Sequence, residues 1–209
     1  MKVKLVAPNG IILDNGCGQG SFAEKHLEGK KVVAIDLSTG MLKRAQKRLP
    51  EPIRADAQQL PFAENSFDTV IARGLLHHLP DPDRGAEEVA RVLKGGGKAV
   101  FVDPLSSALS CLRDRFSRKS DHFSDQHRDF RKKELSSLLS KHFELEALRP
   151  FGYIAYPLLG FPDLLSAYKH FPFKRFFTPA LIKLDELISK IPILKYQAFG
   201  IMALVKKLG

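Results

Sequence analysis

The stretch ILDNGCGQG, residues 12–20, places three glycines between a short apolar run and an amphipathic one. The run Ile11–Asp14 predicts a buried strand, and Ser21 to Glu24 form a capping-box pattern that is typical of a helix start. Glycines in a strand–loop–helix turn allow backbone N–H groups to approach a ligand closely. We therefore expect a ligand-binding turn at residues 15–20.

The spacing of this turn differs from that of a dinucleotide-binding turn. Gly16, Gly18 and Gly20 follow the pattern GxGxG, whereas Rossmann folds that bind dinucleotides use GxGxxG. Asp14 stands directly at the predicted strand end. A carboxylate there repels a pyrophosphate but suits a ligand that carries an ammonium group.

Two further acidic residues end the next predicted strands. The strand predicted over 31–36 ends in Asp36, where a carboxylate can accept hydrogen bonds from both ribose hydroxyls. The strand predicted over 53–56 ends in Asp56, which precedes Ala57 and can accept from an adenine amino group. Each aspartate alone has a structural explanation as a turn residue. Three at one sheet edge together predict a single site.

The rest of the chain continues the alternation of strands and helices. Short apolar runs between helices predict a parallel sheet that is covered on both faces. Strands are expected over 67–72, 98–103, 143–148 and 196–206, and helices over 39–49, 81–93 and 130–142, with Gly95–Gly97 closing the second of these helices.

Composition narrows the class of protein. The chain has 209 residues, 44% of them hydrophobic and 27% charged, which suits one globular domain over residues 1–209. No apolar run approaches the roughly 20 residues of a membrane-spanning helix. The N-terminus lacks the apolar stretch of a signal peptide. The two cysteines, Cys17 and Cys111, cannot form a disulfide framework, and no cysteine–histidine cluster suggests a metal. We expect a soluble, cytoplasmic protein without a metal site.

Charge and aromatic residues concentrate in the second half of the chain. The net charge is +10, of which residues 105–209 carry +8. The segment 149–193 holds nine of the 19 phenylalanines and tyrosines, interleaved with lysines. We expect a helical cap, which either only packs against the sheet or also shapes an apolar acceptor pocket. Peripheral contact to an anionic membrane is a further role that these residues suit. RNA binding is the alternative partner and ranks lower, because leucines flank the aromatic residues.

Four segments carry a resemblance to a known family: ILDNGCGQG (12–20), VVAIDLSTGML (32–42), RADAQQLPFAENSFDTVIARGLLHHLPDP (54–82) and EVARVLKGGGKAVFVDP (88–104). They resemble the class I S-adenosylmethionine-dependent methyltransferases, in particular the small branch with an HxLPDP segment. The resemblance covers about residues 11–104. It implies an α/β fold with a Rossmann-like, seven-stranded, mostly parallel sheet, an antiparallel last strand, helices on both faces and the aromatic-rich insert as a cap. Residues 1–104 would be the cofactor-binding half and 105–209 the substrate side.

The resemblance also implies a cofactor, S-adenosylmethionine, and a set of residues that bind it. Asn15 departs from the family, which usually has an apolar residue there, and Cys17 is interpreted as a small filler rather than a nucleophile. Only ten residues precede the first predicted strand, whereas many relatives have a helical segment there that covers the cofactor. We therefore expect the cover to come from elsewhere or the site to be more open. By resemblance, the methionine part of the cofactor is lined by Gly16, Gly18 and Gly20, with Asp14, Asn15 and Cys17 nearby, and its end is flanked by Arg73. The resemblance implies that Asp36 holds the ribose and that Leu37 and Met41 pack near the adenine and the ribose. It implies that Asp56 and Ala57 contact the adenine.

Methyl transfer is a direct displacement, so a general base is needed only where the acceptor must lose a proton. His77 and His78 follow the fourth predicted strand and are the candidates for that role, and the alternative is that they only support the loop. The segment after Arg73 lacks the Asn/Asp-Pro-Pro-aromatic pattern of enzymes that methylate nucleobases or glutamine. We therefore expect a small or lipid-like acceptor; the alternatives are an RNA methyltransferase and a non-catalytic regulatory protein that binds S-adenosylmethionine.

Overall fold

The computed structural model describes residues 10–107, 129–154, 174–192 and 194–208. One seven-stranded sheet organises them, in the order β3-β2-β1-β4-β5-β7-β6. Every neighbouring pair is parallel except the pairs that β7 forms with β5 and β6. The strands are β1 (Ile11–Asn15), β2 (Lys31–Asp36), β3 (Ile53–Arg54), β4 (Phe67–Arg73), β5 (Leu93–Pro104), β6 (Phe143–Phe151) and β7 (Gly200–Lys207). The expected mixed sheet with an antiparallel last strand is confirmed.

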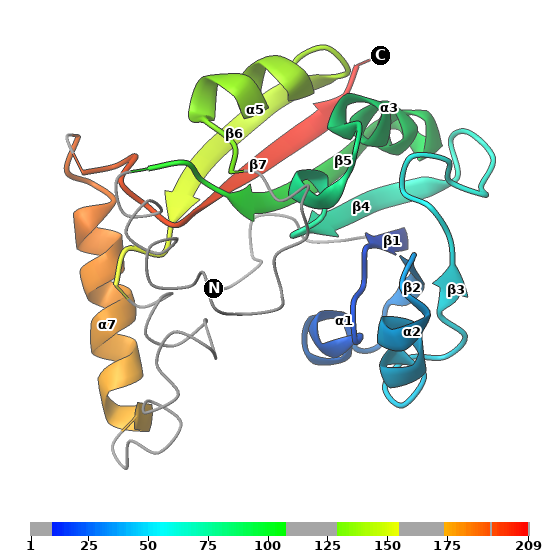
Figure 1. The fold of residues 1–209 in the computed structure, drawn as a ribbon, viewed down its shortest axis with the longest axis horizontal. Coiled ribbons are helices and arrows are strands. Elements are labelled where there is room, and N and C mark those ends of the chain that lie inside the picture. The colour runs from blue at the N-terminus through cyan, green and yellow to red at the C-terminus, as the bar shows by residue number, and fades with distance from the viewer. Residues whose placement is uncertain (1–9, 108–128, 155–173, 193, 209) are drawn as a thin grey trace.

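Helices cover both faces of this sheet (Figure 1). On one face Ile12 and Ile71 pack with Ala23 and Leu27 of the α1 region, and Ala34 packs with α2. On the other face α3 and α5 pack over the main core. The helices are α1 (Ser21–His26), α2 (Thr39–Ala45), α3 (Pro82–Val92), α5 (Lys132–Leu139), α7 (Lys174–Ile188) and the 3-10 turn η1 (Leu76–His78).

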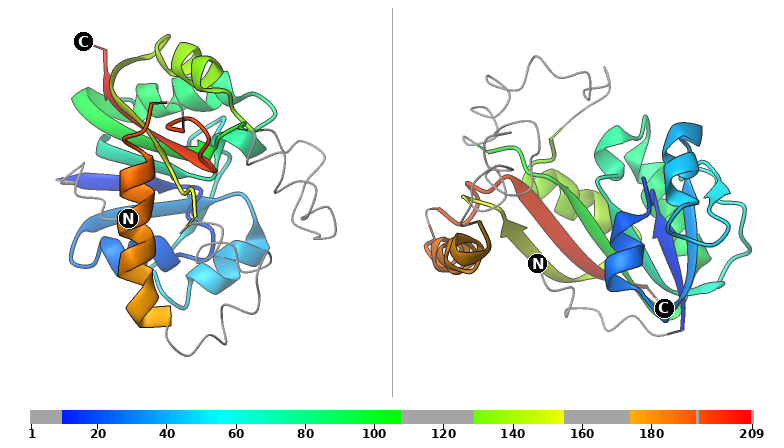
Figure 2. Two further views of the ribbon diagram at one scale, coloured as in Figure 1. Left: turned by 90° about the vertical axis from the view of Figure 1, so that its left-hand side faces the viewer. Right: turned by 90° about the horizontal axis from the view of Figure 1, so that it is seen from below.

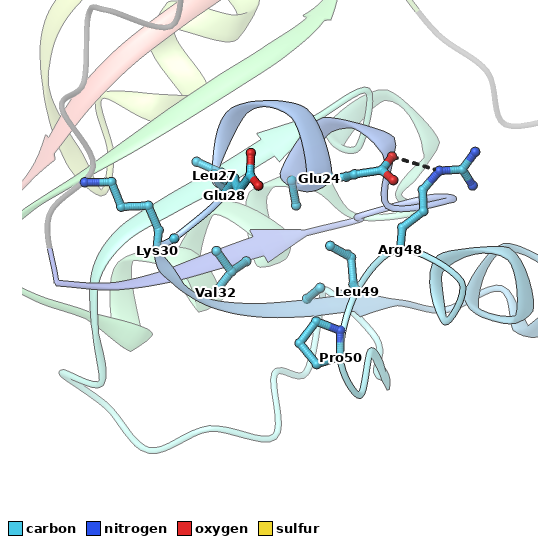
Figure 3. A pocket seen from close by; sticks show the side chains of 11 residues that line it. Glu24, Leu27, Glu28, Lys30, Val32, Arg48, Leu49 and Pro50 are labelled. Carbon is cyan, nitrogen blue, oxygen red and sulfur yellow. Dashed lines mark hydrogen bonds and ion pairs between the residues drawn. The ribbon is translucent and has the colours of Figure 1, made fainter.

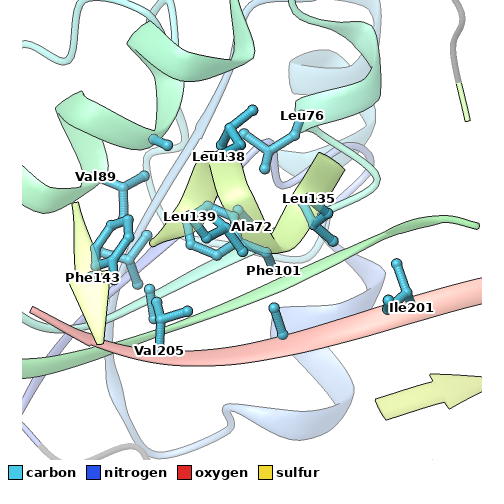
Figure 4. Close-up of a cluster of buried hydrophobic side chains, with 14 of the residues drawn as sticks. Ala72, Leu76, Val89, Phe101, Leu135, Leu138, Leu139, Phe143, Ile201 and Val205 are labelled. Carbon is cyan, nitrogen blue, oxygen red and sulfur yellow. The ribbon is translucent and has the colours of Figure 1, made fainter. Parts of the chain in front are cut away.

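The largest core lies between the sheet and the pair α3 and α5 (Figure 4). Phe101 of β5 and Phe143 of β6 meet there edge to face, with ring centroids 5.8 Å apart. Leu135 and Leu139 of α5 are fully buried against them. Burial of these side chains stabilises the half of the sheet beyond β4 and fixes the position of β5.

Some predicted boundaries are wrong for local reasons. Helix α1 begins at Ser21, and its N-cap is Gly20 at φ 78° without a side-chain cap, so the predicted capping box is not formed. The glycines 95–97 do not close a helix but lie within β5, where the pairing with β4 shifts register. A Cβ at Gly97 would stand 2.9 Å from the Lys94 carbonyl oxygen, so this irregular strand requires glycine there. The helices predicted over 39–49 and 130–142 span only 39–45 and 132–139. Strand β3 ends at Arg54, before Asp56, and β7 begins at Gly200 instead of residue 196.

The aromatic-rich insert leaves the sheet at the edge where the parallel strands end. Pro104, Phe151 and Gly200 are paired in register, so β6 ends and β7 begins beside the end of β5. Helix α7 stands beyond the β6 edge, away from α1 and α2 (Figures 1 and 2). Asp185 ties it down, because its carboxylate accepts from the backbone N–H groups of Tyr153 and Ile154. Residues 155–173, with five of the nine aromatic residues, and 108–128 lie outside the described residues.

None of the helices that the structure describes is long and apolar enough to cross a membrane.

Candidate active site at the carboxyl edge of the sheet

The glycine-rich turn after β1 is held against β2. The N–H groups of Gly16 and Cys17 both donate to the Ile35 carbonyl oxygen, at 3.0 and 2.8 Å. Gly16, Gly18 and Gly20 all have positive φ, between 55° and 78°, which an L side chain rarely adopts. A Cβ at Gly18 would meet no protein atom within 4 Å, so the turn faces open space at this point.

Asp36 fastens the same turn from the end of β2. Its Oδ2 atom accepts from the Gly18 N–H at 2.8 Å, and its Oδ1 atom accepts from the Ser38 N–H at 2.9 Å. Each carboxylate oxygen has a second lone pair. Asp36 therefore positions the glycine turn and still has acceptor capacity for a ligand hydroxyl.

Asp14 is a buried carboxyl group at the end of β1. The residue is 2% exposed, and its Oδ2 atom has no hydrogen-bond partner. Burial raises the pKa of Asp14 to about 6, with the Arg73 guanidinium lowering it and the Asp36 carboxylate raising it. Arg73 ends β4 and lies over the Phe22 ring, 4.1 Å from its centroid. An orphaned carboxylate oxygen beside an open glycine turn fits a ligand that brings a positive charge.

Exposed apolar side chains continue the site beyond Asp36. Leu37 is 58% exposed and Met41 is 40% exposed, at the start of α2. Ile53 of β3 is also 41% exposed, and the sequence analysis did not single it out. Ile53 could have been identified from its place in β3, the strand next to β2, where it pairs with Ile35. These side chains offer an apolar surface beside a carboxylate, which suits a flat base joined to a ribose.

Asp56 and Ala57 lie in a tight turn after β3. The Asp56 Oδ1 atom accepts from the Gln58 N–H at 2.8 Å, which is the local turn bond that an aspartate often makes. Ala57 is buried. The turn occupies part of the carboxylate's acceptor capacity, and contact of these two residues with adenine stays a prediction.

Asn15 and Cys17 are both buried in the turn. Asn15 is fully buried, and neither its Oδ1 nor its Nδ2 atom has a hydrogen-bond partner. The pKa of the Cys17 thiol is raised to about 12, mainly by burial and also by the carboxylates of Asp14 and Asp36. The thiol therefore stays protonated at neutral pH, which argues against a nucleophilic role.

His77 and His78 differ in their surroundings. His77 is 5% exposed and its Nδ1 atom lies 2.8 Å from Oδ1 of Asp103, at the end of β5. His78 is exposed and its ring lies 3.9 Å from the His77 ring, centroid to centroid. The sequence analysis missed Asp103, although it is another aspartate at the end of a predicted strand.

A surface pocket, which we call the hollow, lies outside the candidate active site (Figure 3). Leu27, Val32 and Leu49 line it, and the Arg48 guanidinium pairs with Glu24 at 3.0 Å. It opens near the start of β2, whereas the glycine turn and the three aspartates lie at the ends of the strands. The hollow is therefore separate from the candidate active site.

Comparison with known proteins shows that the first half of the chain is similar to methyltransferases. Residues 13–101 match the family model described as a methyltransferase domain. The chain is 40% identical over 99 residues to demethylmenaquinone methyltransferase of Renibacterium salmoninarum, a match covering 46% of this chain and 42% of that protein. It is 36% identical over 104 residues to 2-methyl-6-phytyl-1,4-hydroquinone methyltransferase of Spinacia oleracea, covering 46% and 30%. It is 35% identical over 105 residues to phosphatidylethanolamine N-methyltransferase of Cereibacter sphaeroides, covering 46% and 52%. The chain thus spans about half or less of the length of these relatives.

Solved structures share the whole fold. A methyltransferase from Thermotoga maritima that depends on S-adenosylmethionine superposes with a TM-score of 0.69 at 20% identity, covering 99% of this chain and 86% of that one. The [4+2]-cyclase SpnF superposes with a TM-score of 0.67 at 21% identity, covering 97% and 76%. The chain therefore has the Rossmann-like fold of these proteins. Because that fold also supports a cyclase, function must be argued from the site.

Proposed function

We propose that this chain transfers a methyl group from S-adenosylmethionine to a small or lipid-like acceptor. The observation that carries the proposal is the turn at Gly18, fastened by Asp36 and open above, inside the segment that matches a methyltransferase domain. The named substrates of the relatives are a quinone, a hydroquinone and a phospholipid, and all three are lipids.

The residues present suit this cofactor. S-adenosylmethionine supplies, when bound, a methyl group on a positively charged sulfur together with an ammonium group. The orphaned Oδ2 atom of Asp14 would stabilise that positive charge, and the spare acceptor capacity of Asp36 would hold the ribose hydroxyls. Leu37 and Met41 would cover the adenine, with Asp56 and Ala57 at its edge. Arg73 would border the methionine end.

A calorimetric titration with S-adenosylhomocysteine tests cofactor binding. We expect micromolar affinity, no binding of NAD, and loss of binding in Asp36→Ala. The matched control is Asp68→Ala, because the Asp68 carboxylate also accepts from a backbone N–H, that of Ile11, but at the start of β4. Absence of binding by the unaltered protein would contradict the proposal and favour a non-catalytic protein.

Turnover is then measured as release of S-adenosylhomocysteine. The acceptors to supply are reduced demethylmenaquinone, 2-methyl-6-phytyl-1,4-hydroquinone and phosphatidylethanolamine in vesicles. Methylation of at least one is expected. Tight cofactor binding without turnover on these lipids or on a pool of RNA would contradict the assignment as a transferase of lipid-like compounds.

The surface of α7 favours an acceptor that resides in a membrane. Leu184 and Leu187 are 41% and 59% exposed, and Phe177, at helical spacing from them, is 44% exposed. The exposed lysines Lys183 and Lys190 flank this stripe. We include in the proposal a peripheral contact of α7 with an anionic lipid surface, because apolar and basic side chains together suit that surface.

A further inference from the structure

We infer that Lys132 and Lys195, which both lie over the ring of Tyr196, bind the phosphate groups of anionic phospholipids at a membrane surface. The inference deepens the membrane contact that is part of the proposed function, and it rests on that contact. It adds a binding point for lipid head groups outside α7, and we call these three residues the lysine–tyrosine cluster.

Two segments that meet at the end of β5 build this cluster. Leu105 directly follows β5, and its N–H donates to the Phe199 carbonyl oxygen at 3.0 Å. Leu105 also forms an isolated bridge with Phe130. Phe130 lies two residues before Lys132, the first residue of α5. Phe199 lies three residues after Tyr196. The fold therefore brings the start of α5 against the segment that joins α7 to β7 (Figure 1).

The Tyr196 ring gathers two positive charges. The Lys132 Nζ atom lies 4.1 Å from the centroid of this ring, and the Lys195 Nζ atom lies 5.7 Å from it. An ammonium group at such a distance is attracted by the electrons of the ring face. Both lysines are exposed, and neither forms an ion pair with a carboxylate of the described residues. Two ammonium groups at one ring, without a carboxylate to neutralise them, favour an anion from outside the protein.

The backbone that carries Lys195 is fixed to the end of β6. The hydroxyl of Tyr153, a residue that is 6% exposed, donates to the Lys195 carbonyl oxygen at 2.7 Å. The Lys195 N–H donates to the Ile191 carbonyl oxygen at 2.8 Å, which closes a helical turn. The backbone at Lys195 is thus held in place by the fold itself, so less freedom is lost when a phosphate group binds.

Exposed apolar side chains adjoin Lys195. Ile191 is 45% exposed and Leu194 is 41% exposed. The N–H groups of Leu194 and Lys195 both donate to the Ile191 carbonyl oxygen, so the three residues belong to one turn. Ile191 and Leu194 continue, at helical spacing, the exposed stripe of Leu184 and Leu187 on α7. Apolar side chains beside ammonium groups suit the boundary between the head groups and the acyl chains of a bilayer.

The same cluster suits RNA less well. Proteins bind single-stranded RNA by stacking bases on exposed aromatic rings as well as by contacts to phosphates. Tyr196 is only partly exposed, and the Lys132 ammonium group lies over its ring, so a base would have to displace the lysine from that face. The observations therefore favour a lipid surface.

Binding to vesicles tests the cluster. The probes are phosphatidylcholine vesicles with phosphatidylglycerol and, as the arm without net charge, phosphatidylcholine alone. We expect the full chain with Lys132→Gln and Lys195→Gln to bind the anionic vesicles about 30-fold more weakly, because each lysine near an anionic surface strengthens binding about fivefold. Binding to phosphatidylcholine alone should be equally weak for both proteins.

The matched control carries Lys43→Gln and Lys47→Gln. It removes the same two charges from exposed positions, one in α2 and one just after it. Its affinity for the anionic vesicles should fall less than about twofold, because a charge more than a Debye length from the membrane is screened. An equal loss in the two double variants would show that only the net charge matters and would overturn the inference.

A single-stranded RNA is the second probe. The two double variants should bind it equally. A selective loss of RNA binding when Lys132 and Lys195 are replaced, with unchanged binding to anionic vesicles, would overturn the inference and assign the cluster to RNA.

The inference and the proposed function fail in different ways. If the variant of Lys132 and Lys195 binds vesicles like the unaltered protein, the inference is wrong, and the contact through α7 stands. If the unaltered protein binds no anionic vesicles, the inference is wrong, whereas turnover of a hydroquinone in detergent still decides the transferase assignment. If the unaltered protein binds no S-adenosylhomocysteine, methyl transfer is wrong, and the vesicles still decide the inference.

Discussion

Asp14 is 2% exposed, and its Oδ2 atom lacks a hydrogen-bond partner. Burial raises its pKa to about 6, so at neutral pH the folded protein holds a poorly solvated charge. Such a carboxylate lowers the free energy of unfolding, and a cation that binds beside it would offset this loss. Two consequences of this arrangement can be measured.

The first consequence concerns cofactor affinity. A ligand with a positive charge stabilises the carboxylate, so binding to the protonated form must release a proton. Affinity for S-adenosylhomocysteine should be constant above about pH 7 and should fall below about pH 6, by up to about tenfold per pH unit. Calorimetry at pH 5, 6 and 7.5 measures this, and Asp14→Asn should bind more weakly but without that dependence. Equal affinities at pH 5 and 7.5 in the unaltered protein would contradict the contact.

The second consequence concerns stability. The pKa of Asp14 is higher in the folded protein than its ordinary value of 3.8, so the residue lowers the free energy of unfolding as pH rises from about 4 to about 6. Asp14→Asn should therefore raise the free energy of unfolding by about 1–2 kcal/mol at pH 7 and leave it unchanged near pH 4. Urea unfolding at the two pH values checks this, and destabilisation at pH 7 would show that the amide fits the site poorly.

Sequence patterns predicted part of this site well. Asp14, Asp36 and the three glycines follow short apolar strands, and strand ends in a parallel sheet meet at one edge. The partners of these side chains were harder to predict. That Asp36 fastens the Gly18 N–H depends on how two turns approach each other. Asp103 escaped notice because its partner, His77, is 26 residues away and belongs to a turn with no regular pattern.

At the scale of elements, the buried Glu88 carboxylate and the partly exposed Arg91 guanidinium, both on α3, bind the segment before β4. Glu88 is 2% exposed and accepts from the Arg91 guanidinium at 2.8 Å and from the Leu60 N–H at 2.7 Å. Arg91 also donates to the carbonyl oxygens of Leu60 and Phe62. The segment that carries Asp56 toward β4 is thus held by side chains of α3.

Arg91→Ala should weaken this link more than an ordinary surface change. The variant leaves the buried Glu88 carboxylate without its main partner, so we expect a loss of about 2–3 kcal/mol in the free energy of unfolding at pH 7. Arg91 lowers the pKa of Glu88, so the difference should shrink as pH falls and Glu88 is protonated. Arg48→Ala is the control, because the Arg48 guanidinium is 34% exposed and pairs with Glu24, which is 44% exposed and makes no contact with Glu88. A loss below about 0.5 kcal/mol is expected for it.

Elements with a clear pattern were predicted closely, and those set by long-range contacts were not. Strand β2 matches residue for residue, and α3 begins after Asp81, whose side chain caps the N–H groups of Asp83 and Arg84 as expected. The start of β5 was misjudged, because three consecutive glycines normally end a helix. Here they continue a strand, since β4 offers a pairing partner that the local sequence does not reveal.

For the molecule as a whole, the order of the strands brings its two halves together. Because β7 runs antiparallel between β5 and β6, the insert leaves and rejoins the sheet at the edge that carries the glycine turn. This arrangement follows from pairing between residues about 100 positions apart, which a single sequence cannot specify. The peripheral membrane contact proposed for α7 would therefore be made by the insert, on the β6 side of the sheet.

Flotation with vesicles tests that contact. The full chain should float with vesicles that contain anionic lipid, and binding should weaken in high salt, because Lys183 and Lys190 contribute by charge. Leu187→Glu places a charge at the most exposed apolar position of α7, where the leucine is 59% exposed, and should reduce the bound fraction at least about fivefold. Leu208→Glu, at a leucine 49% exposed beyond the end of β7, is the matched control and should bind normally. Equal flotation of the two variants would show that α7 is not the membrane-binding surface, and no flotation of the unaltered protein would mean that its acceptor reaches the site through water.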